Sequence, residues 1–209
     1  MTGGHGKSSA ALHGYRYEDH ASDVLGLIRN LRLAAPILLG HSMGGMTAAL
    51  VASQVGDAIR GLILADPTFL TPERQREVWG SDVAQQHRRL LGLDKDQIVA
   101  ESRARHPHRS PEILDLMAEA RLQTRMSAFD VLTPPNPDCR RLLSAVRIPV
   151  VLVIAENGVV SPETARELRN LNPRIQVELI RDAGHGAPYD QPERFEAIVR
   201  SFLRSLAVS

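Results

Sequence analysis

Four short apolar runs divide the chain and give the main strand signal. They are residues 36–40 (PILLG), 61–65 (GLILA), 149–155 (PVVLVIA) and 176–181 (QVELIR). The first three are almost continuously apolar, which is typical of strands that are buried on both faces of a parallel sheet. The fourth alternates between apolar and polar side chains, which indicates an edge strand.

Helical patterns lie between and around these runs. Residues 18–33 place apolar side chains on one face of a helix, and residues 43–55 are rich in small side chains. Residues 161–163 (SPE) are typical of a helix start, and in the last helical stretch Asp190 and Glu193 predict a capping box. Strands that alternate with helices predict an α/β domain with a parallel sheet and right-handed crossovers.

Residues 69–143 break this alternation. The segment carries no convincing strand, but it has helix starts such as residues 71–73 (TPE) and 110–112 (SPE). It closes with residues 134–137 (PPNP), where a helix is disfavoured. We therefore expect residues 69–143 to form a helical insertion, a cap over the active site, and residues 1–68 and 144–209 to form the α/β core.

Composition excludes several classes of protein. The 209 residues carry 25 Lys and Arg against 24 Asp and Glu, so the net charge is +1, and 43% of the residues are hydrophobic. A disordered tail and a nucleic-acid-binding protein that acts through bulk charge are both excluded. The sequence shows no apolar leader and no apolar run long enough to span a bilayer. Since a single cysteine, Cys139, also rules out a disulfide scaffold, we expect a cytoplasmic protein with no membrane partner.

The most informative segment is residues 40–45 (GHSMGG), between an apolar strand and a small-residue helix. Glycines at positions 40 and 44 allow a sharp turn from strand to helix, and such a turn holds Ser42 in a strained conformation with its hydroxyl exposed. The Met43 N–H then lies at a helix start, where free donors and the helix dipole stabilise an oxyanion.

A nucleophilic serine needs a base, and His185 is the best candidate. It lies in residues 182–186 (DAGHG), directly after the last predicted strand. Because loops after parallel strands emerge at the same sheet edge, His185 can reach Ser42. His41 lies inside the turn, and we expect its ring to shape the elbow or the substrate pocket.

These pieces, in this order, resemble the α/β-hydrolase fold family, close to its cap-bearing esterases, lactonases and haloperoxidase-like members. The matching features are residues 4–8 (GHGKS), 40–45 (GHSMGG), 64–67 (LADP), 159–163 (VVSPE) and 182–185 (DAGH). The resemblance implies that Ser42 is the nucleophile, that His185 is the general base, and that an acid after the penultimate strand orients the histidine.

The acid is where the sequence departs from the family pattern. The family usually has an aspartate immediately before the apolar pair that matches Val159 and Val160, but this chain has Gly158 there. Glu156, at the end of the same strand, is the nearest carboxylate and our first candidate. Asp66, after the preceding strand, is the second, although a carboxylate there commonly binds loop amides instead. A third alternative is that water or a carbonyl orients the histidine.

The N-terminus is the second departure. Residues 4–8 resemble the turn after the family's fourth strand, so the first strands and the loop with the second oxyanion donor are expected upstream of Met1. Alternatively, His5 and Gly6 form that oxyanion loop. An N-terminally truncated parallel sheet leaves the strand at residues 36–40 with an open apolar edge. We expect a homodimer or the N-terminal segment to cover it, or the chain to be a fragment.

The leading hypothesis is therefore a serine hydrolase of carboxylic esters with short to medium acyl chains. Two alternatives are C–C hydrolysis or perhydrolysis on the same residues, and a non-catalytic module that binds an acyl ligand or a partner. Residue spacing predicts no metal site, cofactor or phosphate loop. We expect a small-molecule ester substrate whose apolar part contacts cap residues and the elbow; the candidate substrate-binding residues are His41, Phe69, Trp79 and Met126.

Overall fold

The computed structural model describes residues 3–8, 11 and 13–207, and the chain divides into two units. One unit comprises residues 1–20 and 71–136, and the other comprises residues 21–70 and 137–209. We call them the helical unit and the sheet unit. The division differs from the expected one at the N-terminus, because residues 1–20 belong to the helical unit rather than to the core. Helix α1, Tyr17–Asn30, begins in the first unit and ends in the second.

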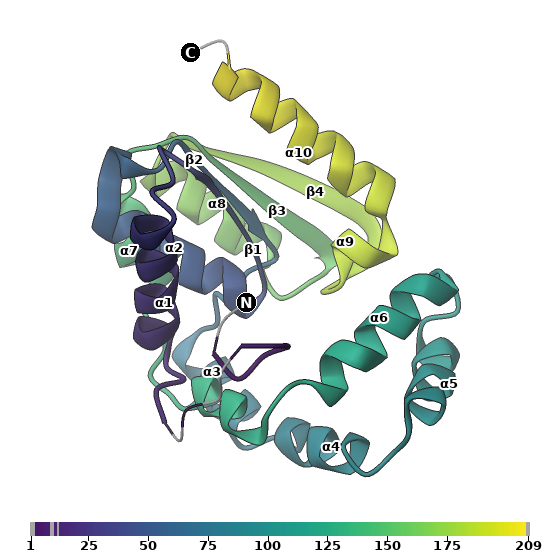
Figure 1. The fold of residues 1–209 in the computed structure, drawn as a ribbon. Helices are drawn as coiled ribbons and strands as arrows, with labels where there is room; N and C mark the ends of the chain where they lie inside the picture. Colours follow the sequence, from purple (N-terminus) through teal and green to yellow (C-terminus); the bar gives the residue numbers. More distant parts are fainter. Residues whose placement is uncertain (1–2, 9–10, 12, 208–209) are drawn as a thin grey trace. The chain divides into compact units, whose positions relative to one another are not determined.

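The sheet unit contains a four-stranded parallel sheet in the order β1-β2-β3-β4 (Figure 1). Its strands are β1 Ile37–His41, β2 Gly61–Ala65, β3 Val150–Asn157 and β4 Ile175–Gly184. Each strand overlaps one of the four apolar runs, and β4 is an edge strand as its alternation predicts. Because all three strand pairs are parallel, all four carboxyl ends lie at one edge of the sheet.

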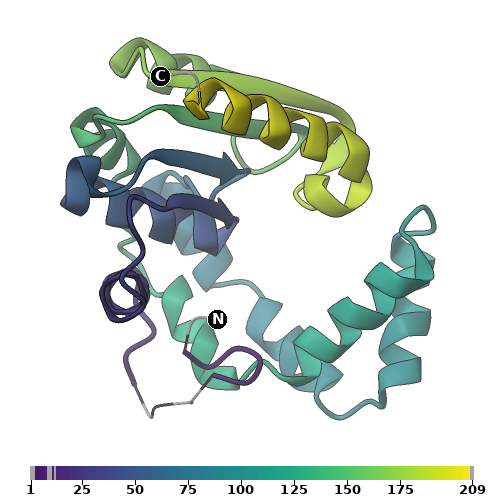
Figure 2. The same cartoon turned by 45° about the horizontal axis from the view of Figure 1, so that its top comes forward.

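Helices cover both faces of this sheet. Helix α10 lies along one face, and α2 and α8 lie on the opposite face (Figures 1 and 2). Under α10, Phe202 and Leu206 pack against Ile63, Val151 and Val153 in the buried core. The helices of the sheet unit are α2 Met43–Val55, the 3₁₀ helix η1 Gly56–Ala58, α7 Cys139–Ala145, α8 Pro162–Leu171, α9 Ala187–Asp190 and α10 Pro192–Ala207.

The helical unit matches the expectation for the segment that lacks strand signals. Its elements after residue 70 are α3 Pro72–Trp79, α4 Val83–Leu90, α5 Lys95–Arg105, α6 Pro111–Leu122 and the 3₁₀ helix η2 Met126–Leu132. The predicted helix starts are confirmed: the Thr71 hydroxyl accepts from the Arg74 N–H, and the Ser110 hydroxyl accepts from the Ile113 N–H. Whether this unit acts as a cap stays a prediction.

Two local expectations in the sheet unit are wrong. The first strand is not buried on both faces, because the Leu39 side chain of β1 is 51% exposed. Nor does Asp190 begin the last helix: it ends the short helix α9, and its carboxylate accepts from the Gly184 N–H at 3.3 Å. Helix α10 begins two residues later, at Pro192. By contrast, the Ser161 cap of α8 is confirmed by its bond from the Thr164 N–H at 3.1 Å.

Candidate active site

Ser42 lies on a tight bend between β1 and α2, as the GHSMGG segment predicts. Its backbone has φ 54° and ψ −122°, a conformation that a residue with a Cβ seldom adopts. Two main-chain bonds join this bend to the end of β2: the Ser42 N–H donates to Ala65 O at 3.0 Å, and the Thr68 N–H donates to Ser42 O at 3.2 Å. The strain at Ser42 is therefore held by the neighbouring strand.

Two glycines provide the space for this bend. A Cβ on Gly40 would lie 2.1 Å from the carbonyl oxygen of Gly44, and a Cβ on Gly45 would lie 2.7 Å from Cβ of Pro67. The expected role of Gly44 is wrong, because a Cβ there has no neighbour within 4 Å outside the local helix backbone. Gly44 instead supplies the backbone that comes so close to Gly40.

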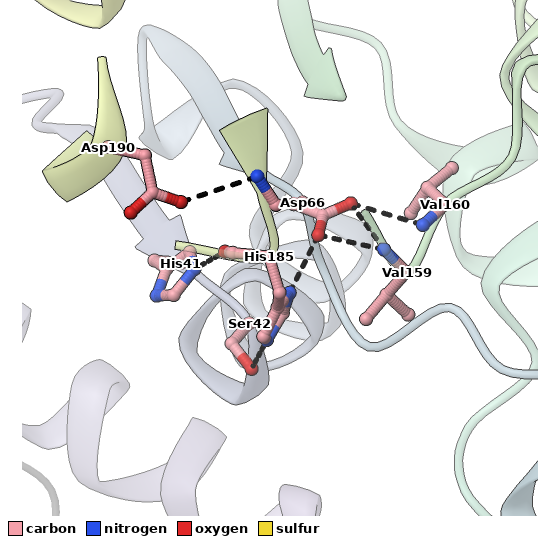
Figure 3. A network of polar contacts seen from close by, with 8 residues as sticks. His41, Ser42, Asp66, Val159, Val160, His185 and Asp190 are labelled. Carbon is pink, nitrogen blue, oxygen red and sulfur yellow. Dashed lines mark hydrogen bonds and ion pairs between the residues drawn. The ribbon is translucent and has the colours of Figure 1, made fainter. Parts of the chain in front are cut away.

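His185 lies directly after β4, and its ring bridges Ser42 and Asp66 (Figure 3). The distance from Nε2 to Ser42 Oγ is 2.8 Å, and the distance from Nδ1 to Asp66 Oδ2 is 2.6 Å. A carboxylate can only accept, so the ring proton lies on Nδ1 and the Nε2 lone pair accepts from the serine hydroxyl. In this tautomer His185 can take a proton from Ser42.

Asp66 begins the turn after β2 and is almost completely buried, with 1% of its surface exposed. Besides the His185 ring, its carboxylate accepts the N–H groups of Val159, at 2.9 Å and 3.1 Å, and of Val160, at 3.1 Å (Figure 3). A buried carboxylate needs such donors to offset its lost hydration. Asp66 therefore combines the two roles that the sequence left as alternatives: it binds loop amides and it contacts the histidine.

Gly158 leaves the space that this carboxylate occupies. A Cβ at position 158 would lie 2.6 Å from Asp66 Oδ1 and 2.8 Å from Asp66 Cγ. No real Cβ tolerates such contacts, so a side chain at position 158 and the present Asp66 carboxylate exclude each other. The glycine that interrupts the family pattern is thus explained by the carboxylate that reaches in from the neighbouring strand.

Glu156, our first candidate for the acid, has a different partner. Its side chain is exposed, and its Oε2 accepts the N–H of Asp182 at 3.0 Å. Between the pairs Ala155–Ile180 and Asn157–Gly184, one residue of β3 lies opposite three of β4, so the strand bulges there. The prediction that Glu156 orients His185 is therefore wrong: Glu156 binds the bulged main chain just before the histidine.

Met43 and His41 flank the serine. Met43 is the first residue of α2, so its N–H has no acceptor one turn earlier in the helix and can face a developing oxyanion. His41 lies at the end of β1, and its Nε2 is 2.7 Å from the carbonyl oxygen of His185 (Figure 3). The ring of His41 therefore contacts the main chain of the other histidine. Its expected contact with substrate stays a prediction.

The remaining predicted substrate contacts belong to different units. Trp79 and Met126 line a cavity of about 410 Å³ in the helical unit, together with Phe129 and Arg88. Phe69 belongs to the sheet unit and is only 5% exposed, so it is a core residue there. The contacts of Trp79, Met126 and Phe69 with substrate stay predictions.

The N-terminal turn also belongs to the helical unit. Gly4 has φ 74°, and a Cβ there would lie 2.6 Å from a ring carbon of Tyr15. The carbonyl of Gly4 accepts from the Arg125 N–H at 3.0 Å. Neither interpretation of this turn, as the end of a family strand or as an oxyanion loop, is tested by these contacts.

Cys139 is not a candidate nucleophile. It lies buried at the start of α7, and burial raises the pKa of its thiol to about 11. Its thiol stays protonated at neutral pH and reacts poorly. Across the described residues, no three His, Cys, Asp or Glu side chains are placed to hold a metal ion. In the same part of the chain, no helix has the length and hydropathy needed to span a membrane.

The model of the alpha/beta hydrolase family matches residues 4–198, which is most of the chain. The chain belongs to this family. The match includes the bend at Ser42 and the loop that carries His185, and it agrees with the observed parallel sheet and its flanking helices.

Known members of the family resemble the chain over most of its length. It is 34% identical over 193 residues to the N-formylmaleamate deformylase of Pseudomonas putida, covering 88% of this chain and 69% of that protein. The solved structure of E-2-(acetamidomethylene)succinate hydrolase has a TM-score of 0.80 at 22% identity, covering 97% and 79% of the two chains. A malate-bound thermophilic esterase from Thermogutta terrifontis has a TM-score of 0.72 at 26% identity, covering 98% and 78%. These relatives are hydrolases, and this chain is similar to them.

Sequence reasoning missed the main-chain partners of the site. The amides of Val159 and Val160 hold Asp66, and the Asp190 carboxylate holds the Gly184 N–H. The sequence offers one signal for the amides of Val159 and Val160. Gly158 replaces the family's aspartate, so this loop has main-chain N–H groups but no carboxylate at that position to accept from them. No sequence signal distinguishes Asp190 in this role from a helix cap.

Proposed function

We propose that this protein is a serine hydrolase that cleaves carboxylic esters of short to medium acyl chains through an acyl-enzyme intermediate. The single observation that carries the proposal is the hydrogen-bonded series from Ser42 through His185 to Asp66, with contacts of 2.8 Å and 2.6 Å. A strained, accessible serine beside an oriented imidazole is the arrangement that activates a hydroxyl for acyl transfer.

Each residue has its own role in this mechanism. His185 Nε2 takes the proton as Ser42 Oγ attacks the substrate carbonyl, and the Met43 N–H binds the oxygen that becomes negative. His185 then gives its proton to the leaving alcohol, which leaves an acyl group on Ser42. Water then attacks this ester with His185 again as the base, the bond from the acyl carbon to Ser42 Oγ breaks, and His185 returns the proton to Oγ as the carboxylic acid leaves. Asp66 holds the ring in the required tautomer and stabilises its positive charge.

Burial supports the role of Asp66 as the acid. Its carboxylate is shielded from solvent, so its attraction to the imidazolium is weakened little by water. The side chain of His185 is 40% exposed, so a substrate or water can reach the ring. Asp66 holds Nδ1, and Nε2 is the nitrogen that exchanges a proton with Ser42.

A second candidate is hydrolysis of an amide on a small carboxylate, with the same three residues. The observation that favours it is the 34% identity to N-formylmaleamate deformylase, together with 25% identity to the 2-(acetamidomethylene)succinate hydrolase of Mesorhizobium japonicum. Both names describe substrates that carry an amide and a carboxylate. C–C hydrolysis and perhydrolysis on the same residues stay alternatives, and the experiment below distinguishes the enzyme from a non-catalytic acyl-binding module.

The rate depends on how many donors bind the oxyanion. The Met43 N–H is the donor that we assign to the oxyanion, and one such donor typically contributes about 10²–10³-fold to turnover. With this donor alone we expect a slow hydrolase, and with a second N–H from residues 4–8 or from a partner chain we expect a faster one.

Turnover of p-nitrophenyl esters of increasing acyl length tests the proposal, with N-formylmaleamate as a competing amide substrate. We expect ester turnover that Ser42→Ala reduces by at least ~10⁴-fold, because the nucleophile is lost. Faster turnover of the amide, again dependent on Ser42, would favour the second candidate. If the folded wild-type protein cleaves neither substrate and Ser42 does not react with an organophosphonate, the proposed function is wrong.

A further inference from the structure

His41 contacts the residue that carries the proposed base, not only the nucleophile beside it in the chain. Its Nε2 lies 2.7 Å from the carbonyl oxygen of His185, and a carbonyl only accepts, so Nε2–H donates. The two imidazole rings lie 4.9 Å apart between centroids, tilted by 34°. The rings of His41 and Tyr189 lie 5.9 Å apart between centroids and are nearly perpendicular, at 89°.

Three side chains hydrogen-bond to the main chain at and just before His185. Glu156 accepts the Asp182 N–H at 3.0 Å, and Asp190 accepts the Gly184 N–H at 3.3 Å. The bond from His41 is the shortest of these contacts and is made to His185 itself. It therefore restrains the peptide from which the imidazole side chain extends.

The bend at Ser42 connects this restraint to the nucleophile. His41 and Ser42 are consecutive residues, and the positive φ of Ser42 is held by main-chain bonds to Ala65 and Thr68. One rigid bend thus sets the position of Ser42 Oγ and of the N–H group that holds His185. The same few residues therefore connect the position of Ser42 Oγ to that of the His185 main chain.

We propose that His41 is a positioning residue that sets the geometry between Ser42 and His185 through its bond to the His185 carbonyl. This inference rests on the proposed function, and the expected contact of the His41 ring with substrate stays a separate prediction. Misplacing a reacting group by about 1 Å can cost ~10²-fold in rate without changing substrate binding. A positioning role therefore predicts a loss in kcat with little change in KM.

Two amide variants test the bond with closely matched side chains. In His41→Gln the amide nitrogen takes the place of Nε2 and can still donate to the His185 carbonyl. In His41→Asn the same group is one methylene too short. We expect kcat for a p-nitrophenyl ester within ~5-fold of wild type for His41→Gln and ~10–100-fold lower for His41→Asn, with KM within about 2-fold for both.

A third variant and a control separate the bond from the ring and from general destabilisation. His41→Phe keeps an aromatic ring against His185 and Tyr189 but has no donor, so we expect it to resemble His41→Asn. His108→Gln, at an exposed histidine of the helical unit, should match wild type. A readout independent of turnover is the low-field proton NMR signal of His185 Nδ1–H, which should shift or broaden in His41→Asn and persist in His41→Gln.

The outcomes distinguish this inference from the function beneath it. If wild-type Ser42 reacts with an organophosphonate and His41→Asn reacts at the same rate, the positioning role is wrong and the hydrolase remains. Equal losses in His41→Gln and His41→Asn, with lowered Tm in both, would also overturn it. If wild-type Ser42 does not react at all, the proposed function has failed first.

Discussion

The ends of β2 and β3 carry similar chemistry with different outcomes. Asp66 follows β2 and Glu156 lies near the end of β3, so both carboxylates are at the same edge of the sheet. Asp66 is 1% exposed and contacts the ring of His185 at 2.6 Å, whereas Glu156 is exposed and binds a main-chain amide. Glu156 lies on the strand after which the family pattern expects the acid, yet Asp66 is the carboxylate that contacts the histidine.

Space and donors explain this difference. Gly158 leaves a volume into which the Asp66 side chain extends, and the amides of Val159 and Val160 supply donors there. Asp66 itself lies directly after β2 with a positive φ of 39°. Glu156 instead faces the bulge of β4, where the Asp182 N–H is its partner. The space and the donors around Asp66 thus determine which carboxylate contacts His185, and its position in the family pattern does not.

The largest expected effect contrasts these two carboxylates directly. Asp66→Asn removes the negative charge and allows the wrong tautomer of His185, so we expect kcat for a p-nitrophenyl ester to fall ~10³–10⁴-fold. Glu156→Gln keeps an oxygen that accepts the Asp182 N–H, so its turnover should stay within ~3-fold of wild type. A reversed order of these two losses would make Glu156 the acid after all.

A smaller effect is expected when the space for Asp66 is filled. In Gly158→Ala the new Cβ would lie 2.6 Å from Asp66 Oδ1, so the carboxylate must move away from the histidine. We expect kcat to fall ~10²-fold, because a displacement of about 1 Å has effects of this size. Gly26→Ala is the matched control, since a Cβ at that position in α1 has no neighbour within 4 Å. Equal turnover in the two alanine variants would show that Gly158 does not limit the position of Asp66.

Moving the acid to the usual family position should restore part of the activity. Asp66→Gly removes the carboxylate while tolerating the positive φ, and it should lose activity about as much as Asp66→Asn. In the double variant with Gly158→Asp, the new Cβ lies 2.6–2.8 Å from the positions that the Asp66 carboxylate atoms occupy in the wild type. The new carboxylate therefore begins close to His185. We expect the double variant to exceed Asp66→Gly by ~10-fold in kcat, an orientation effect that a nearby carboxylate provides. No gain in a folded double variant would show that the two positions are not interchangeable.

The last prediction leaves turnover unaffected and extends the comparison to a buried group away from the site. Burial raises the pKa of Cys139 from 9.0 to about 11, so its thiol stabilises the fold fully below pH 9. As the pH rises from about 9 to about 11, the unfolded state loses its thiol proton first, and stability is lost. A pKa difference of 2 corresponds to at most about 3 kcal/mol in the free energy of unfolding. Cys139→Val should lack this alkaline loss relative to wild type in urea titrations, and parallel curves would contradict the assignment.

Much of the sheet and half of the site could be predicted from sequence because their signals are local. The strand at Gly61–Ala65 and the helix at Met43–Val55 are observed with the predicted bounds. Apolar runs and flanking glycines within or next to each element determine these bounds. The bend at Ser42 and the loop of His185 also follow from short segments. Their meeting follows from the rule that parallel strands end at one edge.

The acid and the ends of several elements could not be predicted in the same way. The partner of His185 depends on which side chain fills the space left by Gly158, and only the packing of β2 against β3 brings these residues together. Asp190 has a sequence typical of a helix cap, yet its carboxylate binds Gly184 across a turn. Leu39 is exposed although its strand is apolar, because β1 lies at one end of the sheet order among the described residues.

The rate at which an organophosphonate modifies Ser42, located by peptide mass spectrometry, tests the central claim most directly. The account predicts an adduct on Ser42 in wild type, a rate at least ~10²-fold lower in Asp66→Asn, and a rate close to wild type in Glu156→Gln. An adduct that forms equally fast in Asp66→Asn and wild type, or that forms elsewhere in the folded protein, would contradict it.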